Sequence, residues 1–244
     1  MLARDPTRSQ RRSCRVRIAI YFTPLPSSLL HRLGSEWLGR NAWTGESVIQ
    51  PEIQDLAVMT ESPRRYGFHA TLKPPFTLDD GVTEDHLKEA IERLCSQETS
   101  FEVRPRVGNM DGFLALVFDQ PSGALQRIAE RCVTELDCFR RPPSEAELAR
   151  RRKTPLTIRQ EAFLQQWGYP YVLEEFRFHM TLSGQLAPEA LAPLVAAASF
   201  HFAPVLSKPV MIDGLTLFTE VEPGAPFTAI QHFPFQTPSP ESAR

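Results

Sequence analysis

The 244-residue chain has few cysteines, and their spacing predicts neither a metal site nor a disulfide framework. The four are Cys14, Cys95, Cys132 and Cys138, and no two of them form a C-x-x-C pair. Zinc sites use such close pairs, and disulfide scaffolds are short chains with denser cysteines. We therefore expect reduced, mostly buried thiols, as in a cytoplasmic protein.

The chain also lacks a net positive charge and long apolar runs. The net charge is −2 and the isoelectric point is near 6.3, whereas a domain that binds nucleic acid is usually basic or carries a basic stripe. No apolar run approaches the ~20 residues that span a bilayer. The Arg-rich start is followed by residues 18–22, which are too few for the apolar region of a signal peptide. We expect neither long nucleic acid nor a membrane as a partner.

The most distinctive feature that is present is a short motif that occurs twice. Residues 68–72 and 178–182 both read Phe-His-x-Thr-Leu. Both copies lie in short apolar and β-branched stretches, which favour a strand over a helix. The prolines at positions 74 and 75 are expected to end the first of these strands, because proline cannot continue a ladder in the middle of a sheet.

Each motif strand is predicted to have a polar, cationic front and an apolar back, because alternate side chains of a strand share a face. The front residues are His69, Thr71 and Lys73 in the first strand, and Arg177, His179 and Thr181 in the second; Arg65 has the same parity as His69. Two such fronts facing one cleft would offer two imidazoles, two hydroxyls and fixed positive charge. An anionic phosphoryl group needs that set.

Turn and cap signals divide the chain into parts. The predicted parts are a disordered basic arm (1–14), a first lobe (15–139), a helical insertion or lid (140–171), a second lobe (172–235) and a disordered tail (236–244). The second lobe repeats the order motif strand, helix (188–198) and two strands (210–219 and 227–233) in abbreviated form. This order predicts an α+β fold with two pseudo-symmetric lobes, each an antiparallel sheet with helices packed outside, flanking a central cleft.

The insertion and three tyrosines each allow two interpretations. The basic run 150–153 can lie on a lid that carries substrate contacts, although a basic run on a helix is more often a solvated face. Tyr66, Tyr169 and Tyr171 flank turns near the motifs, where they can stack on a sugar or a base. Tyrosines in such positions more often only pack.

The paired histidines suit general acid–base chemistry. Histidine titrates near pH 6.5, so one member of a pair can accept a proton while the other donates one. The threonine two residues on can donate a hydrogen bond to a phosphate oxygen, and Lys73 and Arg177 can neutralise its charge. A metal site at His69 and His179 is less well supported, because neither motif supplies an adjacent carboxylate or cysteine at ligand spacing.

The two motifs resemble those of the two-histidine (2H) phosphoesterase superfamily, which has one His-x-Thr/Ser motif, followed by a hydrophobic residue, in each lobe of a pseudo-symmetric α+β fold. His69-Ala70-Thr71-Leu72 and His179-Met180-Thr181-Leu182 both match. From about residue 15 to 235, the chain also resembles an uncharacterised bacterial branch that accompanies phosphonate-degradation (carbon-phosphorus lyase) genes. The resemblance implies that His69, Thr71, His179 and Thr181 are catalytic, with His179 as the base and His69 as the acid.

The resemblance further implies a hydrolase that needs no metal or other cofactor. Its substrate would be a small cyclic phosphate, such as a ribose cyclic phosphate of phosphonate catabolism. One alternative is a 2′,3′-cyclic phosphodiesterase or ligase that acts on RNA ends. Another is a non-catalytic protein that binds a phosphorylated metabolite, although a pure binder has no need of two proton-transfer groups.

Overall fold

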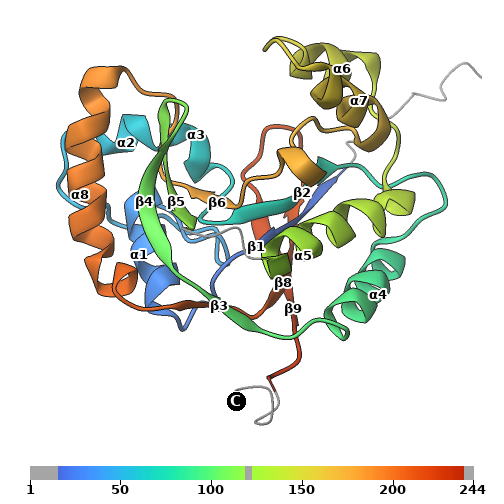
Figure 1. Cartoon of the computed structure of the whole chain (residues 1–244), viewed down its shortest axis with the longest axis horizontal. Helices are drawn as coiled ribbons and strands as arrows, with labels where there is room; N and C mark the ends of the chain where they lie inside the picture. The colour runs from blue at the N-terminus through green and yellow to red at the C-terminus, as the bar shows by residue number, and fades with distance from the viewer. Residues whose placement is uncertain (1–15, 119–122, 239–244) are drawn as a thin grey trace, which may run out of the picture.

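The computed structural model describes residues 16–118 and 123–238, and Figure 1 shows their arrangement. The elements in chain order are β1 (Arg17–Phe22), α1 (Leu29–Leu38), α2 (Leu56–Met59), α3 (Glu61–Arg64), β2 (Ala70–Phe76), α4 (Glu84–Cys95), β3 (Phe101–Val103), β4 (Pro105–Met110), β5 (Phe113–Phe118), α5 (Gly123–Thr134), the 3₁₀ helix η1 (Asp137–Phe139), α6 (Glu145–Arg151), α7 (Ile158–Trp167), the 3₁₀ helix η2 (Leu173–Glu175), β6 (His179–Thr181), α8 (Pro188–Leu206), β7 (Val210–Ile212), β8 (Gly214–Glu220) and β9 (Thr228–Pro234). The predicted arm, residues 1–14, lies outside the described residues.

A seven-stranded antiparallel sheet forms the centre of the fold, with strand order β4-β5-β6-β2-β1-β8-β9, and β3 pairs with β7 in a small second sheet. The predicted α+β class is confirmed. The two motif strands are neighbours, and Ala70 of β2 faces Met180 of β6. The expected division into two consecutive lobes with separate sheets is not what the structure has. Because β8 pairs with β1 and β5 pairs with β6, each half of the sheet takes strands from both parts of the chain.

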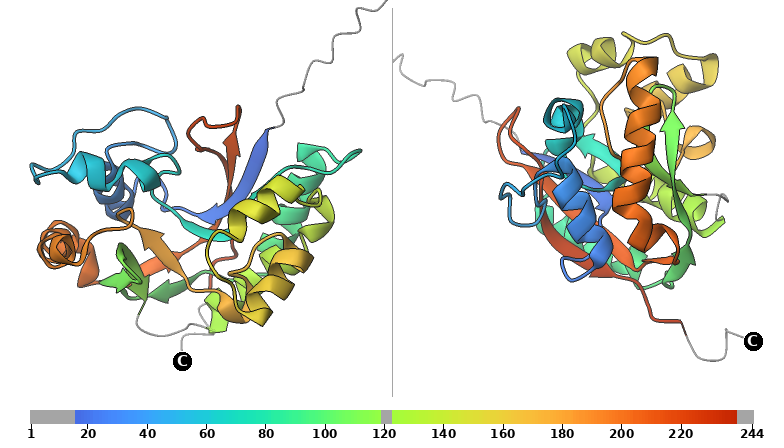
Figure 2. Two further views of the ribbon diagram at one scale, coloured as in Figure 1. Left: turned by 90° about the horizontal axis from the view of Figure 1, so that it is seen from above. Right: turned by 90° about the vertical axis from the view of Figure 1, so that its left-hand side faces the viewer.

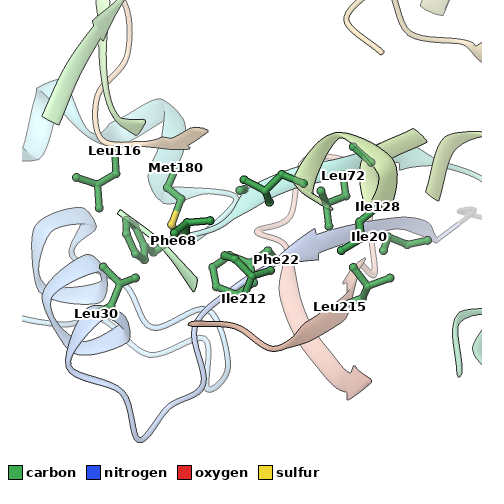
Figure 3. Packing of buried hydrophobic residues seen from close by; sticks show 14 of the residues in the cluster. Ile20, Phe22, Leu30, Phe68, Leu72, Leu116, Ile128, Met180, Ile212 and Leu215 are labelled. Carbon is green, nitrogen blue, oxygen red and sulfur yellow. The ribbon is translucent and has the colours of Figure 1, made fainter. Parts of the chain in front are cut away.

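One face of the sheet is covered by helices, and most of the core lies there. Side chains of α1, α4, α5 and α8 pack against the inward residues of β1, β2, β5, β6 and β8 in one buried cluster, part of which is drawn in Figure 3. Burying each large aliphatic side chain of this kind contributes about 1.5–3 kcal/mol. Figure 2 shows α8 beside α1 on one flank of the sheet. On the opposite face a smaller buried cluster, made of Ala19, Tyr21, Ala42, Phe218, Phe227 and Ala229, lies beside the polar side chains of the motif strands.

The helix boundaries follow local capping chemistry. Ser28 accepts a hydrogen bond from the His31 amide at the start of α1, and Gly39 ends this helix with a φ of 76°, a conformation that glycine adopts without a steric penalty. Thr83 forms a capping box at the start of α4. In both helices the side chain of the residue before the first turn therefore marks where the helix begins.

The helix α8 differs from the prediction in length and in apolarity. It was expected over 188–198 but has 19 residues and a mean hydropathy of 1.4. By length and composition alone it could cross a membrane, so the statement that no apolar stretch approaches that length was wrong. Core helices of folded domains pass the same test. Leu194, Ala198 and Phe202 recur at helical spacing and are buried in the core cluster.

Two strand boundaries also differ from the predictions. The first motif strand continues through Pro74 and Pro75 to Phe76. Its described pairing with β6 is at Ala70, so the prolines remove no hydrogen bond on that side. The predicted strand 210–219 is split into β7 and β8, which belong to different sheets. The tail expected to be disordered from residue 236 is held at its start, because the Gln236 amide donates to the Glu98 carbonyl.

Candidate functional site

A cavity of about 430 Å³ lies on the sheet face opposite the main core. Its walls come from β1, β2, β6, the segment before β2, and the helical insertion. It is lined by all four residues that the resemblance implies are catalytic, namely His69, Thr71, His179 and Thr181. The two motifs, far apart in the sequence, therefore share one cavity.

The strand register explains how the four side chains meet. Ala70 and Met180 face each other across β2 and β6, and both are buried on the core side. In an antiparallel pair the next residues on either side project to the opposite face. His69 is thereby set opposite Thr181, and Thr71 opposite His179. Directly opposed residues have Cβ atoms about 4.5–5.5 Å apart, so each imidazole is placed beside the hydroxyl of the other motif.

The two imidazoles are held in the same way. His69 Nδ1 donates to the carbonyl of Gly67 at 2.9 Å, and His179 Nδ1 donates to the carbonyl of Arg177 at 2.7 Å. A carbonyl only accepts, so Nδ1 carries the proton in both rings. Nε2 is then the nitrogen that can exchange a proton with a ligand. His69 Nε2 lies 3.2 Å from Thr71 Oγ1.

Burial lowers the pKa of both histidines. The pKa of His69 falls to about 4 because the ring is desolvated; the hydrogen bond to Gly67 raises it, and the charge of His179 lowers it. The pKa of His179 is lowered by burial, raised by its backbone hydrogen bond and lowered by the charge of Arg177. Before an anion binds, both rings are neutral near pH 7. A pKa of about 4 leaves Nε2 of His69 unprotonated near pH 7, which is the state that a general base needs.

Aromatic packing and a glycine orient the His69 ring. The ring stacks on Tyr21 of β1, with centroids 3.9 Å apart. The acceptor carbonyl belongs to Gly67, whose φ is 75°, and a Cβ there would lie 2.4 Å from the Cβ of Ala42. A larger residue at this position would strain the backbone and displace the carbonyl. Thr23 donates to the carbonyl of Phe68 at 2.7 Å, which holds the same segment.

Two arginines of the cavity share a buried carboxylate. Arg17 of β1 and Arg65 both donate to Glu220 of β8, whose side chain is 1% exposed. Burial raises the pKa of Glu220, but hydrogen bonds from Arg17, the Gly224 amide and Arg65, with the charge of Arg17, outweigh burial and lower it. Both guanidinium groups line the cavity. Glu220 therefore fixes their positions and cancels one of their charges.

The insertion brings further cations and a tyrosine to the cavity. Arg150 and Arg151 of α6 line it together with Tyr169, which follows α7. The Arg151 guanidinium lies over the Tyr169 ring, 4.7 Å from its centroid. Of the two interpretations of the basic run, the structure supports contacts with the cavity for these two residues. Arg152 instead pairs with Glu161 of α7 at 2.6 Å.

Three of the predicted substrate-binding residues do not line the cavity. Lys73 is buried on the core face and donates to Asp137 and to the Val133 carbonyl, both at 3.2 Å. The parity argument was wrong because one residue of β1 opposes two of β2 between the Tyr21–Thr71 and Ile20–Lys73 pairs. Such a bulge turns the following side chain to the other face.

The other two residues lie at the surface. The Arg177 side chain is 70% exposed and pairs with Asp111, which is 88% exposed. Tyr171 is 42% exposed and packs edge-on against Tyr169. Tyr66 and Arg65 line the cavity.

Sequence reasoning missed Arg17 and Tyr21. Both belong to β1 and are separated by an even number of residues, so they lie on the same face of the strand as Ala19. That signal was present, but only the contact of β1 with the motif strand tells which face is the cavity. Within the described residues, no group of three His, Cys, Asp or Glu side chains is placed to hold a metal ion.

Two relatives match most of this chain. A protein named ribose 1,5-bisphosphate phosphokinase PhnN, from Janthinobacterium sp. (strain Marseille), is 42% identical over 229 residues, which are 90% of this chain and 51% of that protein. A protein of the same name from Laribacter hongkongensis (strain HLHK9) is 35% identical over 214 residues, or 87% of this chain and 50% of that protein. The chain thus spans about half the length of the curated relatives it matches.

Solved structures and a family model also match. A structure described as a phosphoesterase matches 91% of this chain and 99% of its own, with a TM-score of 0.40 and 12% identity. Kluyveromyces marxianus Usb1 matches 89% of this chain and 99% of its own, with a TM-score of 0.33 and 10% identity. The model of a family described as a protein of unknown function (DUF1045) matches residues 71–228, from within the first motif to beyond the second. The chain belongs to the DUF1045 family.

Proposed function

We propose that this protein is a two-histidine phosphoesterase that opens a small cyclic phosphodiester without a metal ion. The observation that carries the proposal is the register Ala70–Met180, which sets the two His-x-Thr motifs opposite each other on one cavity wall. Two imidazoles that can each exchange a proton through Nε2 on one cavity can act as a general base and a general acid for the same ligand. A protein that only binds phosphate has no need of two proton-transfer groups.

The reaction is an in-line attack of water on the phosphorus atom. His69 takes a proton from the water through Nε2, and a new P–O bond forms as the P–O bond to the sugar oxygen breaks. His179, protonated once the anion is bound, gives its proton to the leaving oxygen. Thr71 and Thr181 donate hydrogen bonds to the non-bridging oxygens, and Arg17 and Arg65 neutralise their charge. The product is a phosphomonoester.

The substrate is proposed to be a phosphorylated sugar. The cavity volume of about 430 Å³ suits a molecule of that size. Both matching relatives carry a name that refers to a ribose bisphosphate, and the resemblance to the phosphonate-associated branch implies a ribose cyclic phosphate. The net charge of −2 gives no general attraction to a long RNA.

Phosphorus NMR tests the proposal directly. Purified protein in EDTA would be mixed with ribose 1,2-cyclic phosphate, a 2′,3′-cyclic nucleotide, and a short RNA that ends in a cyclic phosphate. We expect turnover in EDTA, with the ribose compound preferred. His69→Gln and His179→Gln should each lower kcat by about 10²- to 10⁴-fold, the worth of one proton transfer. His86→Gln, on α4 outside the cavity, is the matched control and should keep activity.

Other outcomes would point elsewhere. Loss of turnover in EDTA would refute the metal-free mechanism, and preference for the RNA would favour the RNA-end alternative. If no compound reacts and the folded glutamine variants still bind phosphate as tightly as the unmodified protein, the protein is a binder rather than an enzyme.

A further inference from the structure

The cavity carries more positive charge than one cyclic phosphodiester balances. Arg17, Arg65, Arg150 and Arg151 line it, and Glu220 is the carboxylate that pairs with the first two. Four guanidinium groups and one carboxylate leave a surplus of about three positive charges at neutral pH. A cyclic phosphodiester bound between the His-x-Thr motifs brings a single negative charge, so most of the surplus is unmatched.

The surplus is concentrated away from the histidines. Arg150 and Arg151 also line a neighbouring hollow bounded by Pro75 and Thr77, whereas Thr71 lies near the start of β2. Thr71 and Pro75 are separated by at most about 13 Å of extended strand. Figure 1 shows α6 above β2 at this part of the fold. The arginines of α6 therefore occupy a separate place on the cavity wall, at a spacing that one small molecule can bridge.

These two arginines are available to a ligand. Among the ion pairs of the described chain, none joins Arg150 or Arg151 to a carboxylate. The nearest acid in the sequence of this helix, Glu147, lines the same hollow; it accepts hydrogen bonds from the amide and hydroxyl of Ser144. Burial raises the pKa of Glu147, but these hydrogen bonds and the charge of Arg150 lower it, without a direct ion pair. Tyr169 supports Arg151 through the face of its ring, which leaves the N–H groups at the edge of the guanidinium free to donate.

We propose that Arg150 and Arg151 form a second phosphate subsite, which binds a phosphomonoester of the same substrate. This inference rests on the proposed function and narrows it: the substrate is a small sugar with a cyclic phosphodiester at one end and a phosphomonoester at the other. A phosphomonoester carries a charge of about −1.5 to −2 at pH 7. Together with the cyclic group it balances the surplus of about three. Guanidinium groups bind such a phosphate through paired N–H donors.

The test compares two substrates that differ only in that phosphate. The measured quantity is the ratio of kcat/KM for ribose 1,2-cyclic phosphate 5-phosphate to that for ribose 1,2-cyclic phosphate. We expect a ratio of about 10 to 100 in the unmodified protein, the worth of charge-assisted hydrogen bonds. In Arg150→Gln/Arg151→Gln the ratio should fall to about 1. The control Arg152→Gln/Lys153→Gln removes the same charge from the same segment outside the cavity, and should keep the ratio.

A binding measurement separates failure of this inference from failure of the proposed function. Calorimetry with ribose 5-phosphate and with ribose needs no turnover. We expect the unmodified protein to bind ribose 5-phosphate but not ribose. The Arg150→Gln/Arg151→Gln variant should bind ribose 5-phosphate at least tenfold more weakly. If neither cyclic compound reacts but this difference is found, the subsite stands and the phosphodiesterase proposal fails. Turnover with equal rates for both compounds, or a ratio unchanged in the variant, overturns the subsite. A clear preference for RNA that is lost in the variant overturns the small-sugar assignment.

Discussion

The burial of His69 predicts how the stability of the free protein depends on pH. The pKa of His69 is about 4 in the folded protein, against about 6.5 in an unfolded chain. At pH values between these two, the unfolded state binds more protons, so acid destabilises the fold. The contribution is fully present above pH 6.5 and is lost as the pH falls towards 4. With 1.36 kcal/mol per pKa unit, the loss is about 2 kcal/mol at pH 5 and about 3 kcal/mol near pH 4.

His69→Gln isolates this contribution. Glutamine has no charge to gain, so the variant should lose about 2 kcal/mol less free energy of unfolding than the unmodified protein between pH 7.5 and pH 5. Urea titrations measure the free energy of unfolding of both proteins at both pH values. Subtracting the pH-dependent change of the variant from that of the unmodified protein removes the contributions of all other titrating groups. His179→Gln should act in the same direction, because burial lowers that pKa as well.

Two results would refute the reasoning. One is a free-energy difference between His69→Gln and the unmodified protein that is the same at both pH values. The other is an NMR titration in which the His69 ring gains its proton at or above pH 6.5. Either would mean that water or a nearby anion compensates the ring charge in the folded state, so that burial does not hold His69 neutral.

Two further variants test the positions of buried charged residues. Glu220→Gln should lower the free energy of unfolding by about 3 kcal/mol in urea titrations, because two guanidinium groups lose their buried carboxylate. Glu222→Gln, at an exposed position, is the control. An equal effect of the two variants would contradict the role of burial. Lys73→Met should leave kcat/KM unchanged and alter stability by less than about 1 kcal/mol, since Asp137 keeps its pair with Arg140. A large loss of kcat/KM would mean that Lys73 reaches the cavity after all.

The charge of the cavity contrasts with that of the whole chain. A protein with a net charge of −2 gathers four arginines on one cavity from β1, the segment before β2, and α6. A cleft lined by one sign of charge raises the local concentration of ligands of the opposite sign. Salt should therefore weaken binding of a charged substrate more than that of a neutral one. The overall net charge does not indicate this local concentration of positive charge.

The local structure could be predicted where the signals are local. Ser28 and Gly39 bound α1 because a side-chain oxygen and a residue free to adopt positive φ satisfy the ends of a helix within a few residues of sequence. Alternation in the motif strands was enough to expect His69 and Thr71 on one face. The prediction failed at Lys73, because a bulge depends on how β1 pairs with β2, and that pairing is not local.

The sequence by itself determined the catalytic candidates and the α+β class. Two copies of Phe-His-x-Thr-Leu supply the two imidazoles, and the periodicity and caps specify most helices and strands. Only the tertiary structure decided which strands are neighbours, and hence that His69 lies opposite Thr181. It also decided which cations serve the cavity, since Arg17 and Arg151 reach it from distant segments while Arg177 lies outside. The physical reason is that strand pairing and charge placement depend on contacts between residues far apart in the chain, which no local pattern encodes.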